Sequence, residues 1–489
     1  MTGKGIIELK NVSLTYPSAE HPSLTDVDLS VDSGEVVVVI GPSGCGKTSV
    51  TRVINGLAEQ YYGGKLTGSV HVDDLDVRQS KLYEIGRKVG SVFQDPRSQF
   101  FATLVEDEVA FGMENYGIDH HLLEERVNAS LEQVKAENLK GKEVFPLSSG
   151  EKQKVAIASV GAVNPLAYVF DEPSANLVMK SADALGELIN DLKMQGHAIV
   201  VAEHRIYYLA NIADRFIYMQ GGKIVRILKR AELLALSDGE RERLGIRSPC
   251  IRAENNAPRR QRHIFKNGLE ISKLSYMVGP RLVLDHLDLR VPSGICIALV
   301  GSNGVGKTTL ARCICGLIKE KGGEIALSGE SMNQRGRRRS TYFVMQNTDC
   351  QLFADSVAEE LHLNCPDLSD SETRALLDAY GLSDFKDAHP MTLSGGQKQR
   401  LAIAVAELLD VSVIVLDEPT SGLDLRSMRM VSKRLKELAS RGKTVLVISH
   451  DYEFIASTCA IAVHLETSSC IKYLEMEESA ERLLAALME

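Results

Sequence analysis

The sequence predicts two tandem α/β domains, each with a mixed or parallel sheet core and a helical subdomain, and three observations support this fold class. First, the 489 residues of the chain exceed the roughly 100 to 200 residues of one typical domain. Second, the same ordered series of motifs occurs twice, which indicates a tandem duplication. Third, each half alternates short β-branched runs with amphipathic stretches, the pattern of a doubly wound core.

The domain boundaries follow from one segment of unusual composition. Arg247 to Lys266 contains two prolines, a cluster of basic residues and little hydrophobic periodicity, which is typical of a linker. We therefore expect domains at residues 1–246 and 267–489, joined by residues 247–266. We interpret the basic cluster, and the similar run Arg335 to Arg339, as solvated connectors rather than contacts with lipid headgroups or nucleic acid.

Bulk composition narrows the function classes. Hydrophobic residues at 44% and charged residues at 25% describe an ordinary globular protein, and the net charge of -9 disfavours binding to a nucleic acid backbone. No apolar run approaches the roughly 20 residues that span a bilayer, and the N-terminus lacks the pattern of a secretion signal, so we expect a cytosolic chain. The nine cysteines lack CxxC pairs and histidines at zinc-site intervals, and we expect reduced thiols.

A glycine-rich loop follows an apolar run near the start of each half. Val36 to Ile40 leads into GPSGCGKT at 41–48, and Ile297 to Val300 leads into GSNGVGKT at 301–308. Both fit the strand and GxxxxGK[ST] pattern of a P-loop, whose amides and helix N-terminus hold phosphate while the lysine neutralises it. The residues that we expect to bind the nucleotide here are Gly41, Ser43, Gly44, Gly46, Lys47, Thr48 and Ser49, and Gly301, Asn303, Gly304, Gly306, Lys307, Thr308 and Thr309.

Two further apolar runs each end in a carboxylate pair. Ala167 to Phe170 precedes Asp171-Glu172, and Val413 to Leu416 precedes Asp417-Glu418. At the carboxyl ends of parallel strands such pairs lie beside the P-loop. We expect Asp171 and Asp417, with Thr48 and Thr308, to hold Mg²⁺, and Glu172 and Glu418 to polarise the attacking water.

A helical insert is predicted between the phosphate loop and the carboxylate pair of each half. In the second half, Ser369 and Glu372 form a capping-box pattern ahead of apolar residues that reach Tyr380 at helical spacing.

Two motifs, LSSGE at 147–151 and LSGGQ at 393–397, lie before the carboxylate pairs. With them the chain resembles the ATP-binding cassette superfamily of P-loop NTPases, whose cofactors are ATP and Mg²⁺. The resemblance implies that the two cassettes pair head to tail within the chain. Ser148 and Gly150 would then contact the ATP bound by Lys307, and Ser394 and Gly396 the ATP bound by Lys47.

The resemblance also assigns residues outside these motifs. It implies the Q-loop glutamines, which help catalysis and bind Mg²⁺, the switch histidines and the adenine-stacking tyrosines, and these are Gln94 and Gln346, His204 and His450, and Tyr16 and Tyr276. Since both halves keep these residues, we expect both sites to hydrolyse ATP. One departure indicates unequal sites, because Asp424 of the second half has Val178 as its counterpart in the first.

Within the superfamily, the first half is similar to the ATPases of energy-coupling factor importers, which take up vitamins and transition metal ions in prokaryotes. The similar stretches are VFQDP at 92–96, QFF at 99–101, VEDEVAFG at 105–112 and AEHR at 202–205. The resemblance implies a peripheral protein at the cytoplasmic face of the cell membrane. Its partners would be a transmembrane coupling protein and a substrate-binding membrane protein, docked beside residues 99–101 and 351–353.

Two alternatives stay open. The first is a ribosome-associated two-cassette translation factor, against which the short linker and the acidic balance argue. The second is the fused ATPase of an ordinary sugar importer, against which the QFF and AEHR stretches argue.

Overall fold

Each half of the chain forms its own unit in the computed structural model, which describes residues 5–17, 19, 21–251, 267–476 and 480–488. The units are Met1–Cys250 and Ile251–Glu489. This division falls inside the segment 247–266 expected to be a linker, of which residues 252–266 lie outside the described residues. Arg247, at the start of that segment, is buried.

The centre of the first unit is a six-stranded sheet with the order β10-β9-β3-β8-β7-β6. The five strands from β9 to β6 are parallel, and β10 pairs antiparallel with β9. Every residue of β3 is buried, as expected of an apolar run covered on both faces. The strands are β3 (Val36–Ile40), β6 (Val89–Val92), β7 (Ala167–Asp171), β8 (Ala198–Ala202), β9 (Arg215–Gln220) and β10 (Lys223–Leu228).

A smaller antiparallel sheet with the order β2-β1-β4-β5 lies over one face of this sheet. Its strands are β1 (Ile7–Thr15), β2 (Leu24–Val31), β4 (Lys65–Val72) and β5 (Leu75–Asp76). Side chains of β3 alternate between two hydrophobic cores. Val37 and Val39 pack with the antiparallel sheet, whereas Val36, Val38 and Ile40 pack with helices on the other face.

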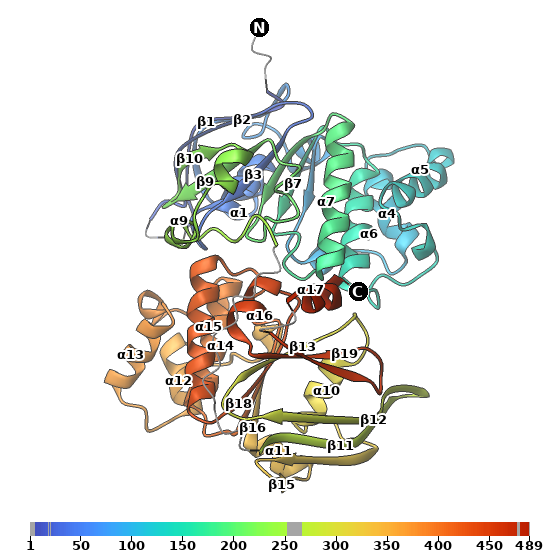
Figure 1. Ribbon diagram of the computed structural model, residues 1–489. Coiled ribbons are helices and arrows are strands. Elements are labelled where there is room, and N and C mark those ends of the chain that lie inside the picture. Colours follow the sequence, from blue (N-terminus) through green and yellow to red (C-terminus); the bar gives the residue numbers. More distant parts are fainter. Residues whose placement is uncertain (1–4, 18, 20, 252–266, 477–479, 489) are drawn as a thin grey trace. The chain divides into compact units, whose positions relative to one another are not determined.

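Helices pack on both faces of the central sheet: α1, α2 and α3 contribute to the core shared with the antiparallel sheet, whereas α4, α5, α6 and α7 cover the second face and build a helical subdomain at one end. Figure 1 shows α4, α5 and α6 gathered there, beside the long helix α7. The helices are α1 (Lys47–Ile54), α2 (Leu57–Gln60), α3 (Leu82–Lys88), η1 (Pro96–Gln99), α4 (Val105–Asn115), α5 (His120–Gln133), η2 (Glu137–Leu139), α6 (Ser149–Gly161), α7 (Met179–Met194), α8 (Arg230–Leu234) and α9 (Asp238–Leu244).

The second unit repeats this architecture. Its sheets have the orders β16-β17-β18-β13-β19-β20 and β12-β11-β14-β15, and β20 is the antiparallel edge strand. The strands are β11 (Asn267–Val278), β12 (Arg281–Pro292), β13 (Cys296–Val300), β14 (Gly322–Leu327), β15 (Glu330–Ser331), β16 (Thr341–Val344), β17 (Val413–Asp417), β18 (Thr444–Ile448), β19 (Ile461–Leu465) and β20 (Ile471–Glu475).

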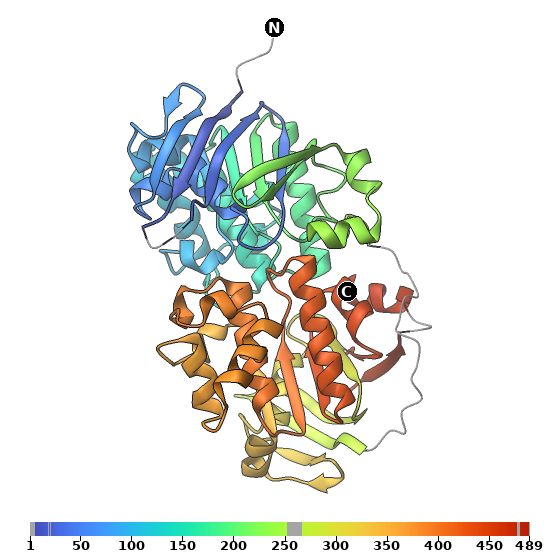
Figure 2. The same cartoon turned by 90° about the vertical axis from the view of Figure 1, so that its left-hand side faces the viewer.

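In the second unit the long helix α15 packs against β18 and β13 and can be followed in Figure 2. The helices are α10 (Lys307–Ile314), α11 (Gln334–Ser340), η3 (Thr348–Cys350), α12 (Val357–Asn364), α13 (Asp370–Ala379), η4 (Ser383–Phe385), η5 (Pro390–Thr392), α14 (Gly395–Leu408), α15 (Leu425–Ser440), α16 (Tyr452–Thr458) and α17 (Ala480–Met488). The predicted fold class, two α/β domains with sheet cores and helical subdomains, is confirmed.

The predicted capping box at the start of α13 is present. Ser369 Oγ accepts a hydrogen bond from the Glu372 amide at 3.3 Å, and the Glu372 carboxylate accepts one from the Ser369 amide at 2.9 Å. Among the described helices, none has the length and apolar character needed to cross a membrane. All nine cysteines are free.

One sequence interpretation is wrong. The run Arg335 to Arg339 belongs to α11 rather than to a solvated connector, and Arg337 is only 1% exposed. The Arg337 guanidinium pairs with Glu320 and donates to the carbonyl oxygens of Cys313 at 3.1 Å and Met332 at 2.8 Å. A charge count could not reveal this, because the partners of Arg337 come from other elements.

Candidate functional site

A glycine loop connects β3 to α1 in the first unit. Gly41, Gly44 and Gly46 have φ values of 146°, 78° and 105°, which only glycine adopts without strain. A Cβ at Gly41 would lie 2.3 Å from the carbonyl oxygen of Met219, whereas a Cβ at Gly44 would meet nothing within 4 Å. The loop therefore packs tightly against β9 at Gly41 and borders free space at Gly44.

The loop between β13 and α10 has the same shape. Gly301, Gly304 and Gly306 have φ values of 145°, 78° and 116°, and a Cβ at Gly304 would again meet open space. Asn303 is exposed beside it. Both loops thus present their backbone to a free volume at a helix N-terminus, the geometry that holds phosphate.

A buried lysine closes each loop. Lys47 is 4% exposed, and its ammonium donates to the carbonyl oxygens of Gly41 at 3.2 Å and Pro42 at 3.3 Å. Lys307 is 7% exposed and donates to Gly301 and Ser302 at 2.7 and 3.0 Å. Burial lowers the pKa of Lys307, while Glu418 and Asp417 oppose this shift.

A threonine and an aspartate meet beside each lysine. Thr48 Oγ1 donates to Asp171 Oδ1 at 2.9 Å, and Thr308 Oγ1 donates to Asp417 Oδ2 at 3.0 Å. Burial raises the pKa of both carboxyls, and the threonine hydrogen bond opposes the rise. A hydroxyl and a carboxylate are the oxygen ligands that Mg²⁺ prefers, so this pair fits the ion.

No group of three or more His, Cys, Asp or Glu side chains placed to hold a metal occurs among the described residues. The Thr48 and Asp171 pair fits an ion that is shared with phosphate, because Mg²⁺ commonly takes one or two carboxylates and completes its shell with phosphate oxygens and water.

Three polar side chains converge at the end of β7. Gln94 Nε2 donates to Glu172 Oε2 at 3.0 Å, and His204 Nε2 lies 3.4 Å from Glu172 Oε1. Glu172 has a φ of 44°, a strained conformation that proteins retain mainly at functional sites. The structure therefore brings the predicted Q-loop glutamine, catalytic glutamate and switch histidine together in the first unit.

The second unit has a similar arrangement with longer distances. Glu418 has a φ of 49°, and its Oε1 lies 3.7 Å from His450 Nε2. The Ser449 hydroxyl donates to Glu418 Oε2 at 3.3 Å. Gln346 is exposed two residues after β16, as Gln94 is after β6.

The predicted adenine-stacking tyrosines are half-buried. Tyr16 packs against the core of the first unit, and its ring meets Tyr62 edge to face with centroids 6.2 Å apart. Tyr276 packs against the core of the second unit. The remaining predicted contacts, Ser43, Ser49 and Thr309, lie in the loop or in the first turn of the helix that follows.

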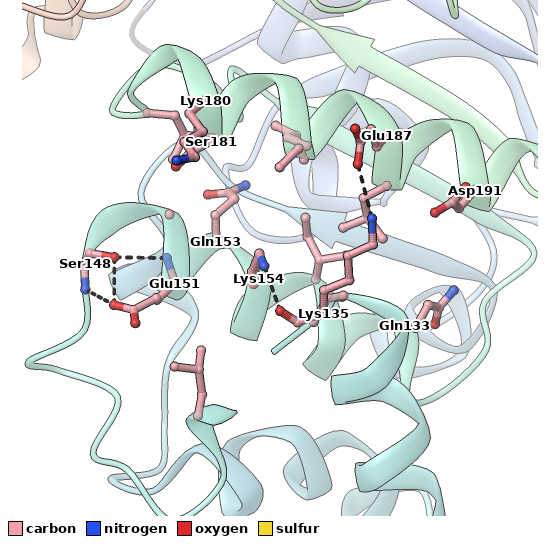
Figure 3. Close-up of a pocket in the computed structure, with 18 of the residues that line it drawn as sticks. Gln133, Lys135, Ser148, Glu151, Gln153, Lys154, Lys180, Ser181, Glu187 and Asp191 are labelled. Atoms are coloured by element: carbon pink, nitrogen blue, oxygen red, sulfur yellow. Dashed lines mark hydrogen bonds and ion pairs between the residues drawn. The ribbon is translucent and has the colours of Figure 1, made fainter. Parts of the chain in front are cut away.

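The two signature serines are helix N-caps. Ser148 Oγ accepts from the Glu151 amide at 3.3 Å and donates to Glu151 Oε2 at 2.7 Å, which lowers the pKa of that carboxyl. Figure 3 shows this pair at one end of a cavity of about 460 Å³ between α6 and α7. Ser394 caps α14 in the same way with Gln397, so the first signature carries a negative charge that the second lacks.

The signature glycines permit close approach. A Cβ at Gly150 would lie 2.7 Å from Ser181 Oγ, and one at Gly396 would lie 2.8 Å from Leu423 Cδ2.

An exposed phenylalanine lies after the Q-loop in each unit. Phe101 and Phe353 are 74% and 75% exposed. Glu108, 2% exposed, accepts hydrogen bonds from the amides of Phe101 and Ala102, both at 2.8 Å. Phe100, by contrast, packs against the core, so Phe101 is the aromatic residue that a partner can reach.

Glu360 repeats the role of Glu108. It is 1% exposed and accepts from the amides of Phe353 at 2.7 Å and Ala354 at 2.9 Å. Sequence reasoning missed both carboxylates. The available signal was an acidic residue at the same distance after QFF and QLF, inside a segment with apolar periodicity.

Gln99 and Gln351 hold the base of these loops. Gln99 accepts from the Phe93 amide and donates to the Ser91 carbonyl, both at 2.8 Å. Gln351 bonds Met345 and Phe343 likewise, at 2.7 and 2.6 Å. Their side chains therefore shape the loops rather than contact a partner.

Comparison with known proteins identifies the family. The family described as ABC transporter matches residues 24–175 and 284–421. A Treponema denticola protein named "Putative ABC transporter ATP-binding protein" is 39% identical over 481 residues, covering 97% of this chain and 98% of the relative. The Bacillus subtilis protein named "Putative HMP/thiamine import ATP-binding protein YkoD" is 33% identical over 482 residues, covering 92% of this chain and 88% of the relative.

Solved structures share the fold of the whole chain. A structure titled "RNase-L Inhibitor" aligns with a TM-score of 0.65 at 22% identity, covering 97% of this chain and 92% of the other. An ABCE1 chain in a model of ribosome-bound archaeal Pelota and ABCE1 aligns with a TM-score of 0.69, also at 22% identity, covering 97% of this chain and 80% of the other. Because the identity is low, these likenesses show the two-cassette fold alone. The chain therefore belongs to the ABC transporter ATP-binding family, as an ATPase with two cassettes in one polypeptide.

Proposed function

We propose that the chain powers an importer of the energy-coupling factor class, which takes up a vitamin or a transition metal ion. It would act at the cytoplasmic face of a prokaryotic cell membrane, on a transmembrane coupling protein and a substrate-binding membrane protein. The name of the Bacillus subtilis relative, which refers to HMP and thiamine import, supports this class.

The observation that carries the proposal is the pair of exposed phenylalanines, one in each cassette. Phe101 and Phe353 are exposed on loops that buried carboxylates fix in place. Phe101 also stacks on Phe111, which is itself exposed, and contiguous exposed apolar side chains mark surfaces that partners cover. Two such loops suit a membrane partner that contacts both cassettes.

The chemistry follows from the geometry of each cassette. Bound ATP with Mg²⁺ supplies the phosphoryl group that is transferred to water. In the first cassette Lys47 neutralises phosphate charge, and Thr48 and Asp171 hold the cation. Glu172 accepts the proton of the attacking water, while Gln94 and His204 orient Glu172 through the contacts at 3.0 and 3.4 Å.

The corresponding residues of the second cassette are Lys307, Thr308, Asp417, Glu418, Gln346 and His450. We infer from the family resemblance that the cassettes pair within the chain, so that Ser148 and Gly150 complete the second site and Ser394 and Gly396 the first. Helix N-termini capped by serine suit this role, because their free amides attract phosphate.

A ribosome-associated translation factor is the alternative from another class. Its support is the fold shared with ABCE1 at 22% identity, whereas the relatives at 33% and 39% identity carry transporter names. The fused ATPase of an ordinary sugar importer is the second alternative and differs only in its membrane partners.

Affinity purification from gently solubilised cells, followed by mass spectrometry, tests these proposals. We expect small hydrophobic membrane proteins in stoichiometric amounts, one of them a substrate-binding protein. Ribosomal proteins without membrane proteins would overturn the transporter proposal. Recovery of sugar-permease subunits would overturn only the energy-coupling factor class.

A further inference from the structure

A buried carboxylate joins two segments of the first ATP site. Glu203 is 2% exposed, and its Oε2 accepts from the Ser174 amide at 3.3 Å and the Ser174 hydroxyl at 2.7 Å. Its Oε1 accepts from the amides of His204 at 2.7 Å and Arg205 at 3.1 Å. Ser174 follows Glu172 by two residues, so Glu203 ties the glutamate segment to the switch histidine.

Arg205 adds a second tie to the same segment. Its Nη1 donates to the carbonyl oxygens of Ser174 at 3.2 Å and Leu177 at 3.0 Å. The next residue, Val178, occupies the N-cap of α7, where it supplies no side-chain hydrogen bond. The arginine therefore holds a loop whose helix cap lacks a polar side chain.

The second unit connects the same two segments with other residues. Asp451 Oδ2 accepts from Thr420 Oγ1 at 3.0 Å, and its Oδ1 accepts from the Phe454 amide at 3.2 Å. Asp424 caps α15 by accepting from the Ser427 amide at 2.7 Å. The residue pairs that occupy equal positions in the two switch segments are Glu203 and Ser449, Arg205 and Asp451, and Tyr208 and Phe454.

The three substitutions between the units compensate for one another. In the first unit the Tyr208 hydroxyl donates to Glu203 Oε2 at 2.9 Å. In the second unit both partners of this hydrogen bond are replaced, the tyrosine by Phe454 and the glutamate by Ser449. The acidic side chain lies before the histidine in one unit and after it in the other. Each unit thus has one carboxylate that links its switch segment to the segment after the catalytic glutamate.

We propose that Glu203 and Arg205 are positioning residues of the first ATP site, which fix the position of His204 relative to Glu172. The proposal rests on ATP hydrolysis at this site with Glu172 as the base, and it does not depend on which membrane partner binds. A buried carboxylate with several donors is rigid, and a displacement of about 1 Å between reacting groups costs about 100-fold in rate.

The test uses the full chain carrying Glu418→Gln, so that turnover reports on the first site. In this parent, Glu203→Ser is expected to lower kcat by about 10- to 100-fold, while KM for ATP stays within about twofold because the phosphate loop is untouched. Rates are normalised to bound nucleotide, which removes the effect of unfolded protein.

A transplant of the second unit's residues distinguishes positioning from general damage. The combined variant Glu203→Ser, Arg205→Asp and Tyr208→Phe supplies a carboxylate at position 205, while Ser174 provides the hydroxyl that Thr420 provides in the second unit. We expect kcat to recover to within about threefold of the parent. A combined variant as slow as Glu203→Ser, with parental nucleotide binding and thermal midpoint, would overturn the proposal.

Two further variants keep the test decisive. Arg205→Gln removes the contacts to two loop carbonyls but keeps the Glu203 carboxylate. If Glu203→Ser does not fold, this variant tests the proposed positioning role. A lower kcat with an unchanged thermal midpoint supports the proposal, and a parental kcat refutes it. Arg78→Gln, which removes an exposed ion pair, is the matched control. A parent without any ATPase activity would refute instead the proposed hydrolysis at this site.

Discussion

Replacing Phe101 and Phe353 by alanine, singly and together, probes the surface assigned to the membrane partner. The two side chains are 74% and 75% exposed. An aromatic side chain buries about 200 Å². Covering three quarters of that area at about 25 cal/mol per Å² contributes about 3 to 4 kcal/mol for each ring, as an upper bound.

We therefore expect each single substitution to cost about 2 kcal/mol of binding free energy, or about 30-fold in affinity. The assay is binding of the labelled chain to inverted membrane vesicles that contain the partner but lack the native chain. The ATPase activity of the free chain should not change, because Glu108 and Glu360 bond the loop amides rather than the rings.

Stability and a matched aromatic residue provide the controls. Phe101 stacks on Phe111 with centroids 4.9 Å apart, so its removal costs only about 0.5 to 1.5 kcal/mol of folding free energy. Tyr83, 59% exposed on α3, serves as the comparison, and Tyr83→Ala should bind normally. Parental binding by the Phe101→Ala, Phe353→Ala chain would refute the docking surface.

Three further predictions concern single residues. Glu172→Gln and Glu418→Gln should each remove about 100-fold or more of the turnover at one site, and the residual ATPase activities should differ; equal residual rates would contradict the inequality of the sites. Arg337→Ala should lower the free energy of unfolding by about 3 to 5 kcal/mol, measured by urea denaturation, because it empties the site of a side chain that is 1% exposed and leaves the half-buried Glu320 carboxylate without this partner; a loss below about 1 kcal/mol would mean that the pair behaves like a surface ion pair. Ser369→Ala, which removes the N-cap of α13, should lower the free energy of unfolding by about 0.5 to 2 kcal/mol, measured by urea denaturation. Since Ser369 lowers the pKa of Glu372 from its ordinary value of 4.5, the stabilisation is present above that pH and is lost as the pH falls through the lowered pKa; a cost that did not shrink in acid would refute this linkage.

Local patterns were enough to predict the positions of the glycine loops and of the carboxylate pairs. The loops at 41–48 and 301–308 and the two carboxylate pairs could be recognised because each pattern is contiguous and lies at a strand end. The Ser369 capping box was predictable for the same reason, since both partners lie within one turn of helix.

Residues whose partners lie far away in the sequence could not be predicted. Glu203 bonds Ser174, which is 29 positions earlier, and Arg337 donates to Cys313, which is 24 positions earlier. A sequence shows that such a residue is charged but not that tertiary packing buries it beside a donor or acceptor. Hydrogen bonds between residues that are distant in the sequence are therefore the part of the structure that the sequence does not reveal.

The two cassettes agree in the geometry of their glycine loops and differ in the segments that we propose to trigger hydrolysis. The glycine loops have φ values that match within a few degrees at their first two glycines, and both lysines and both threonine and aspartate pairs make the same contacts. The differences lie in the switch segment, the helix cap and the signature. Val178 and Glu151 of the first unit correspond in sequence to Asp424 and Gln397 of the second. Under the proposed function, this distribution predicts two sites of similar affinity and unequal turnover, and such inequality suits a motor whose two proposed membrane partners differ.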